Sequence, residues 1–128
     1  MKAYVSYLSP LGRVLIAAIF LLAGISKISG YEATQSYMSA MGVPGSLLPA
    51  VIAFEIVAAL AIIVGFKTRI VASVLAGFCI VTAAVFHGNL GDQMQFILFM
   101  KNIAIAGGFL FLVVNGPGAF ALDDRKPA

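Results

Sequence analysis

The sequence is poor in the residue types that most often carry redox and metal chemistry. Among 128 residues there is one cysteine, Cys79, and one histidine, His87, and tryptophan is absent. A single cysteine excludes an intramolecular disulfide and a dithiol relay. The two residues together also supply too few ligands for a bis-histidine haem or an all-protein zinc site. We therefore expect no metal and no covalently bound cofactor, and we interpret Cys79 as a packing residue.

Charge is scarce as well. Charged residues make up 10% of the chain and hydrophobic residues 62%, whereas a soluble domain has about 25% charged and ~45–50% apolar residues. A soluble domain of this size leaves about a third of its chain surface exposed and could not hide so many apolar side chains. The eight Lys and Arg residues are scattered singly, which excludes a nucleic-acid partner. The chain is short enough to form a single domain over residues 1–128.

Four apolar runs are long enough to span a bilayer, which takes about 20 residues of helix. They cover residues 10–28, 46–66, 70–87 and 95–114. The short segment Lys67–Arg69 between the second and third runs requires these two to lie antiparallel. The sequence therefore predicts an all-α fold, a membrane-embedded four-helix bundle.

The distribution of positive charge predicts the orientation of the spans, because short cytoplasmic loops are rich in Lys and Arg. Lys2, Lys67, Arg69, Arg125 and Lys126 all fall on one side, with Arg13 at its boundary. The other side has only Lys27, at its boundary. We expect both termini to be cytoplasmic.

The first loop on the outer side, residues 29–45, is longer than a turn. Tyr31, Tyr37, Met38 and Met41 recur in it at roughly helical spacing. This pattern predicts a short amphipathic helix at the membrane interface. It is either a packed lid over the bundle or the gate of a ligand site.

The first span carries two cations on one face. At about 100° per residue, Arg13, Ala17, Phe20, Gly24 and Lys27 form one stripe. The glycine would permit a neighbouring helix to approach closely, which indicates that the stripe faces inward. In the alternative interpretation, both cations extend to the headgroup regions.

Glu55 lies near the centre of the second span, where a charge is costly. Lys101 in the fourth span is at a matching depth, and Arg13 could reach Glu55 from the cytoplasmic side. An ion pair with either would reduce the cost of burial. Such a pair either fixes only the helix register or belongs to a polar pocket that binds a ligand.

Two further polar residues complete the predicted polar core. His87 ends the third span at the outer mouth, where it acts either as an interfacial anchor or as part of a site, and Asn102 follows Lys101. The candidate ligand-binding residues are Arg13, Lys27, Glu55, His87, Lys101 and Asn102.

An ordered set of residues along nearly the whole chain resembles the DoxX family. The set comprises Arg13, Phe20, Gly24, Lys27, Glu55, Gly65, Phe86-His87, Lys101-Asn102-Ile103-Ala104, Gly107-Gly108, Gly116-Pro117-Gly118 and Leu122-Asp123. Ala121 departs from the family pattern, which commonly has Ser there. The resemblance implies a four-helix inner-membrane protein. The family name comes from a small subunit associated with a thiosulfate:quinone oxidoreductase and a terminal quinol oxidase, and mycobacterial relatives are linked to an oxidoreductase complex.

Three functions fit these observations. The first is a subunit of a redox-linked complex that binds a quinone or a lipid-like amphiphile in a charged intramembrane pocket, with Glu55 able to accept a proton. The second is a structural or assembly subunit, and the third is a conduit for a small solute or protons. The chain has no redox centre of its own, so we do not expect it to be an enzyme alone. The partners expected are membrane lipids, a redox protein or a second copy of the chain.

Overall fold

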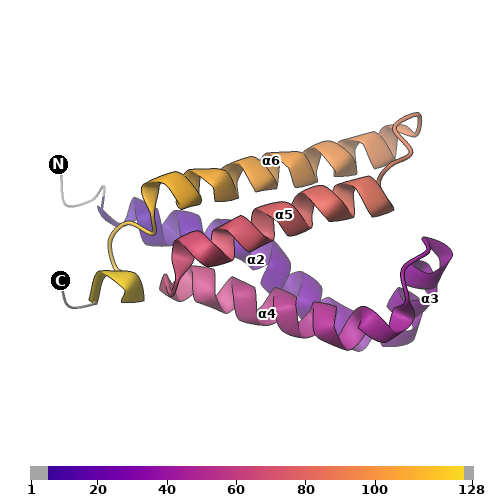
Figure 1. The fold of residues 1–128 in the computed structure, drawn as a ribbon, viewed down its shortest axis with the longest axis horizontal. Coiled ribbons are helices and arrows are strands. Elements are labelled where there is room, and N and C mark those ends of the chain that lie inside the picture. Colours follow the sequence, from indigo (N-terminus) through magenta and orange to yellow (C-terminus); the bar gives the residue numbers. More distant parts are fainter. Residues whose placement is uncertain (1–5, 126–128) are drawn as a thin grey trace.

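The computed structural model describes residues 6–125, and all regular structure in this range is helical (Figure 1). The elements are α2 (Leu8–Ser29), α3 (Tyr31–Ala40), η1 (Gly45–Leu47), α4 (Leu48–Val64), α5 (Thr68–Phe86), α6 (Gln93–Asn115) and η2 (Leu122–Arg125). The two elements labelled η are short 3-10 helices.

Four helices are long and apolar enough to cross a membrane: Leu8–Ser29, Gly45–Val64, Thr68–Phe86 and Gln93–Asn115. Each boundary lies within two residues of the one predicted from the sequence, and α3 occupies the predicted position of the short helix. The all-α fold with four spans is thus confirmed. Lys2 and Lys126 lie outside the described residues, and the cytoplasmic location of the termini stays a prediction.

The four spans are arranged as two pairs. Helix α2 packs along α4, and α5 packs along α6, while α4 and α5 touch over a shorter stretch next to the turn that joins them. In Figure 1 the two pairs come together at the end where η2 lies and separate toward the opposite end, where α3 lies beside α4. We call these the η2 end and the α3 end.

The predicted stripe of α2 does face inward. The buried residues of this helix are Arg13, Ala17, Phe20 and Gly24. A Cβ added to Gly24 would lie 2.6 Å from Cγ1 of Ile56 on α4, closer than any side chain tolerates. The glycine therefore sets the close spacing of α2 and α4.

Arg13 ties three segments together at the η2 end. Its side chain is 1% exposed. Its nitrogens donate to the carbonyl oxygens of Pro117, Ile62, Ile63, Ala119 and Phe120, at 2.7–3.3 Å. These bonds use all five N–H groups of a guanidinium. The Ile62 and Ile63 carbonyls in the last turn of α4 are thereby joined to α2 and to the segment after α6.

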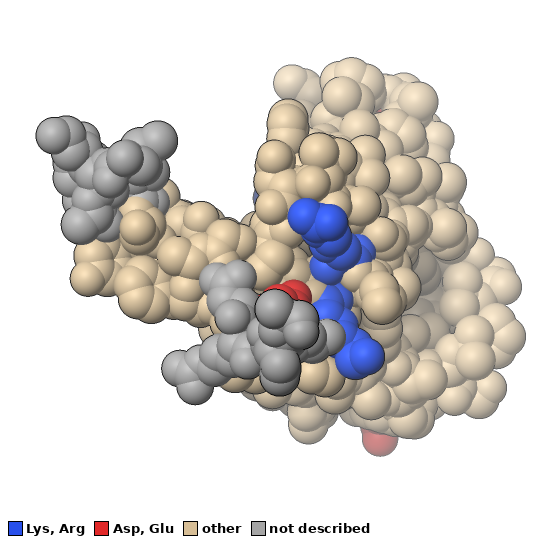
Figure 2. Space-filling view, turned by 60° about the vertical axis from the view of Figure 1, so that its left-hand side comes forward, with Lys and Arg blue, Asp and Glu red and all other residues tan. Residues whose placement is uncertain are grey.

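The segment after α6 also closes the turn between α4 and α5. Asp123 accepts hydrogen bonds from the backbone N–H groups of Lys67 (2.7 Å) and Thr68 (2.9 Å) and so caps the start of α5. Gly65 ends α4 with φ 74°, and a Cβ there would overlap Ala121 and lie 2.9 Å from Nη1 of Arg13. Figure 2 shows Lys and Arg side chains gathered at this end, where Lys67 and Arg69 are exposed.

We predict that Gly65→Ala lowers the free energy of unfolding by about 2 kcal/mol or more. The left-handed backbone alone costs a residue with a side chain ~1–2 kcal/mol, and the overlap with Ala121 adds to this. The matched control is Gly77→Ala in α5, where an added Cβ meets nothing within 4 Å. This change should be neutral or stabilising, because Ala favours a helix by about 0.5–1 kcal/mol. Thermal unfolding of the purified variants in detergent measures both, and equal effects would contradict the packing described for Gly65.

Candidate functional site

A cavity of about 420 Å³ lies between the two helix pairs, toward the α3 end. All five α-helices contribute to its wall, and apolar side chains form most of it. Ligand pockets have volumes of about 300–1,000 Å³ and combine apolar walls with a few polar groups. The cavity therefore has the size and composition of a small-molecule site.

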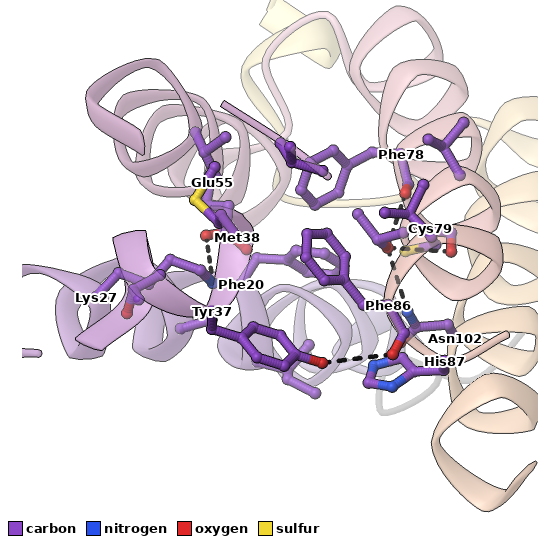
Figure 3. A pocket seen from close by; sticks show the side chains of 18 of the residues that line it. Phe20, Lys27, Tyr37, Met38, Glu55, Phe78, Cys79, Phe86, His87 and Asn102 are labelled. Carbon is purple, nitrogen blue, oxygen red and sulfur yellow. Dashed lines mark hydrogen bonds and ion pairs between the residues drawn. The ribbon is translucent and has the colours of Figure 1, made fainter. Parts of the chain in front are cut away.

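One wall carries an ion pair. Lys27 Nζ lies 2.9 Å from Oε1 of Glu55, and both residues line the cavity (Figure 3). The Glu55 side chain is 5% exposed and that of Lys27 28%. The carboxylate is therefore almost fully withdrawn from solvent, whereas the ammonium keeps access to the surroundings.

The pair depends on the packing of α2 against α4. Lys27 lies in the last turn of α2, and Glu55 lies in the middle of α4. Gly24, one turn before Lys27, brings the two helices together, and Cβ of Glu55 is among the atoms nearest to a Cβ built on this glycine. The close approach thus places the cation within reach of the carboxylate.

The predicted partners of Glu55 were wrong. Lys101 is exposed on α6 and does not line the cavity, although its depth in the membrane is similar. Arg13 lies 14 residues before Lys27 on the same helix, a rise of about 21 Å, and its donors are engaged at the η2 end. Matching positions along two spans therefore did not identify the helix that carries the partner.

The opposite wall, formed by α5 and α6, carries polar groups paired with one another. Asn102 donates from Nδ2 to Oγ1 of Thr82 at 3.2 Å. His87 Nδ1 is 2.8 Å from Oε1 of Gln95. Of the six predicted site residues, the structure thus brings four to the cavity, namely Lys27, Glu55, His87 and Asn102. Arg13 and Lys101 are elsewhere.

Aromatic rings separate the two polar walls. Phe20 and Phe78 line the cavity, and their ring centroids are 6.4 Å apart. Tyr37 of α3 stacks on Phe86 of α5 at 5.5 Å, and its hydroxyl donates to the Phe86 carbonyl at 3.4 Å. These contacts connect α3 to the α5–α6 pair at the end of the cavity.

Sequence reasoning missed Thr82 and the role of Tyr37. Thr82 lies in an otherwise apolar run, and a polar side chain there is a usable signal for an inward face. Tyr37 was recognised as part of an amphipathic helix. Its contact with α5 depends on the course of the loop before α4, which no local pattern encodes.

The cavity also reaches the side of the bundle. Two of its lining residues, Ile19 on α2 and Val81 on α5, are exposed by 45% and 60%. Both lie well inside membrane-spanning helices. The apolar surroundings at that depth are the bilayer interior, so the cavity is accessible to molecules dissolved in the membrane.

Comparison with known proteins supplies the family. Residues 9–88 match the model of the DoxX family. The chain belongs to the DoxX family. Inner membrane protein YqjF of Escherichia coli (strain K12) is 50% identical over 111 residues, which cover 87% of this chain and 85% of YqjF. Inner membrane protein YphA of the same organism is 38% identical, covering 90% of this chain and 87% of YphA.

A third DoxX relative comes from Bacillus subtilis (strain 168) and carries the name "Putative oxidoreductase CatD". It is 30% identical over 111 residues, which cover 80% of this chain and 81% of that protein. No solved structure matches the chain. With four membrane-spanning helices and these relatives, this DoxX protein is a multi-pass protein of the inner membrane.

We predict that Lys27→Met lowers the free energy of unfolding more than Glu55→Gln does. The first change strands a carboxylate that is 4% exposed, and breaking a buried pair costs about 3–5 kcal/mol. The second leaves a lysine that can extend to the membrane surface. The double variant should recover part of the loss, because it strands no charge.

Lys101→Met is the matched control, because this lysine has a similar depth but is exposed. It should change stability by less than about 0.5 kcal/mol. Thermal unfolding in detergent of the unmodified protein, the Lys27 and Glu55 single variants and the double variant gives a double-mutant cycle. Additive losses at Lys27 and Glu55 would contradict the ion pair.

Proposed function

We propose that this DoxX protein binds a ring-headed amphiphile of the quinone class in the cavity, as the membrane subunit of a redox-linked complex. The observation that carries the proposal is the cavity itself. It combines an ion pair, neutral polar groups and aromatic walls, and it is accessible from the bilayer side.

The opening favours a ligand that is dissolved in the membrane. Ile19 and Val81 are exposed at the side of the bundle. A hydrophobic tail could leave the cavity between α2 and α5, where it would remain in apolar surroundings. A water-soluble ligand would have to cross the hydrocarbon to reach this opening.

The walls favour a flat ring as the head group. Phe20, Phe78 and Phe86 line the cavity, and aromatic rings pack favourably in stacked or edge-on arrangements. Lys27, Glu55 and Asn102 supply the small number of polar contacts that orient a ligand in an apolar pocket. A quinone ring with its oxygen substituents combines both properties.

The proposed role in a redox-linked complex is supported by the name of a relative and by the chemistry of the candidate site residues. A 30% identical protein carries an oxidoreductase name. The candidate site residues of this chain can bind and orient a ring and hold a proton at the Glu55 carboxylate. Electron transfer would be supplied by a partner protein.

A conduit is disfavoured by the apolar core between the cavity and the η2 end. The polar cavity and the Arg13 network are separated along α2 by Ala17 and Phe20, which are both buried. The core cluster that contains these two residues also contains Leu75 and Phe109. Polar groups therefore do not continue from one end of the described bundle to the other, as a path for ions or protons requires.

The experiment is a thermal-shift titration of the purified protein in detergent with a short-chain benzoquinone and, separately, with its reduced form. We expect at least one of them to raise the unfolding temperature in a saturable manner, because a ligand that binds only the folded state stabilises it. Ala23→Phe should abolish this shift, because Ala23 lines the cavity and the larger side chain would occupy it.

The matched control is Ala53→Phe, which places the same side chain at an exposed position of α4 outside the cavity. This variant should keep the shift. A shift that survives in Ala23→Phe, or the absence of any shift in the unmodified protein, would contradict the proposal.

A further inference from the structure

The Glu55 carboxylate has an ion-pair partner but too few hydrogen-bond donors. Lys27 Nζ is 2.9 Å from Oε1, and this buried oxygen has no other polar partner among the described residues. Within residues 6–125, the ion pair with Lys27 is the only ion pair or hydrogen bond that the Glu55 side chain makes. The side chain is 5% exposed and lines the cavity.

Such a carboxylate has acceptor positions that no donor of the described residues fills. Its two oxygens offer about four acceptor positions, and buried acceptors that stay unsatisfied cost free energy. The neighbouring turns of α4 itself present apolar side chains, Ile52 and Ala59. Because Glu55 lines the cavity, a donor-bearing molecule held there can supply the missing hydrogen bonds.

His87 lies on the opposite helix pair and also lines the cavity. Its Nδ1 is 2.8 Å from Oε1 of Gln95, a contact in which the donor and acceptor roles depend on the tautomer of the ring. Figure 3 shows Glu55 and His87 on different sides of the cavity, with Phe20 between them.

We infer that the cavity selects a head group that donates hydrogen bonds, so that a dihydroxy ring of the quinol type binds more tightly than the same ring in its quinone form. The inference rests on the proposed function and names the form of the ligand. A hydroxyl of a quinol can donate to the Glu55 carboxylate. A carbonyl oxygen of a quinone would instead bring its lone pairs toward that acceptor.

Lys27 does not reverse this preference. Its ammonium could donate to a quinone carbonyl, but it faces the Glu55 carboxylate, and turning toward the ligand would leave that buried charge without its partner. The quinol leaves the ion pair in place and adds a donor to it. Hydrogen bonds to a charged group are the stronger kind, so the preference should be about tenfold or more in affinity.

The experiment measures dissociation constants under anaerobic conditions for three probes with one ring and one short tail. The probes are the benzoquinone, its quinol and the quinol with both hydroxyls methylated. The purified protein in detergent should bind the quinol at least about tenfold more tightly than either of the others. The methylated probe controls for ring size and oxidation state, because its ring is reduced but has no hydrogen-bond donor.

The discriminating variant is the double substitution Lys27→Met and Glu55→Leu, which removes the acceptor without stranding a charge. We expect its affinity for the quinol to fall to that for the methylated probe. Lys101→Met removes a charge outside the cavity. This variant should keep the preference of the unmodified protein.

The outcomes distinguish a failure of the donor selection from a failure of the proposed function. Equal binding of all three probes, lost in Ala23→Phe, would overturn the donor selection and leave the proposed function standing. A preference that persists in the double variant would overturn the role of Glu55. If none of the probes binds, the proposed function itself fails.

Discussion

The carboxylate of Glu55 is the constraint on which the arrangement of this molecule toward the α3 end depends. A charge in the middle of a membrane-spanning helix must meet a counter-charge or lose its own. Lys27 meets it at 2.9 Å, and it can do so because Gly24 lets α2 and α4 approach within side-chain contact. A single glycine, a carboxylate and a cation one turn away from the glycine thus define one wall of the cavity.

The two cations of the α2 stripe, Arg13 and Lys27, make different kinds of contact. Arg13 donates five hydrogen bonds to backbone carbonyls of α4 and of the segment after α6. These bonds hold the segments together at the η2 end. Lys27 makes a single ion pair and keeps part of its surface accessible. The helix pairs are therefore joined firmly at one end and separate at the other, where the cavity lies. The Arg13 network and the cavity thus lie toward opposite ends of the same helix.

Much of this fold follows from local patterns in the sequence. Span boundaries come from the length of apolar runs, and the inward face of α2 comes from a helical period that was predicted residue by residue and confirmed at Arg13, Ala17, Phe20 and Gly24. The partner of Glu55 was predicted wrongly, because the rise along a helix gives depth but not the rotation of one helix against another. The cap of α5 by Asp123 depends on the return of a segment 55 residues later in the chain. Pairing and divergence of the helices are tertiary properties that no single span encodes.

The central claim is that the cavity holds a membrane amphiphile and is not merely a gap between helices. The most direct measurement is mass spectrometry of the organic extract from protein purified in mild detergent, with Ala23→Phe purified in parallel. The account predicts a ring-headed, hydroxyl-bearing amphiphile in near-stoichiometric amount from the unmodified protein and its loss from the variant. Identical extracts, containing bulk phospholipids in the same proportions, would contradict it and leave the charged pair with a structural role alone.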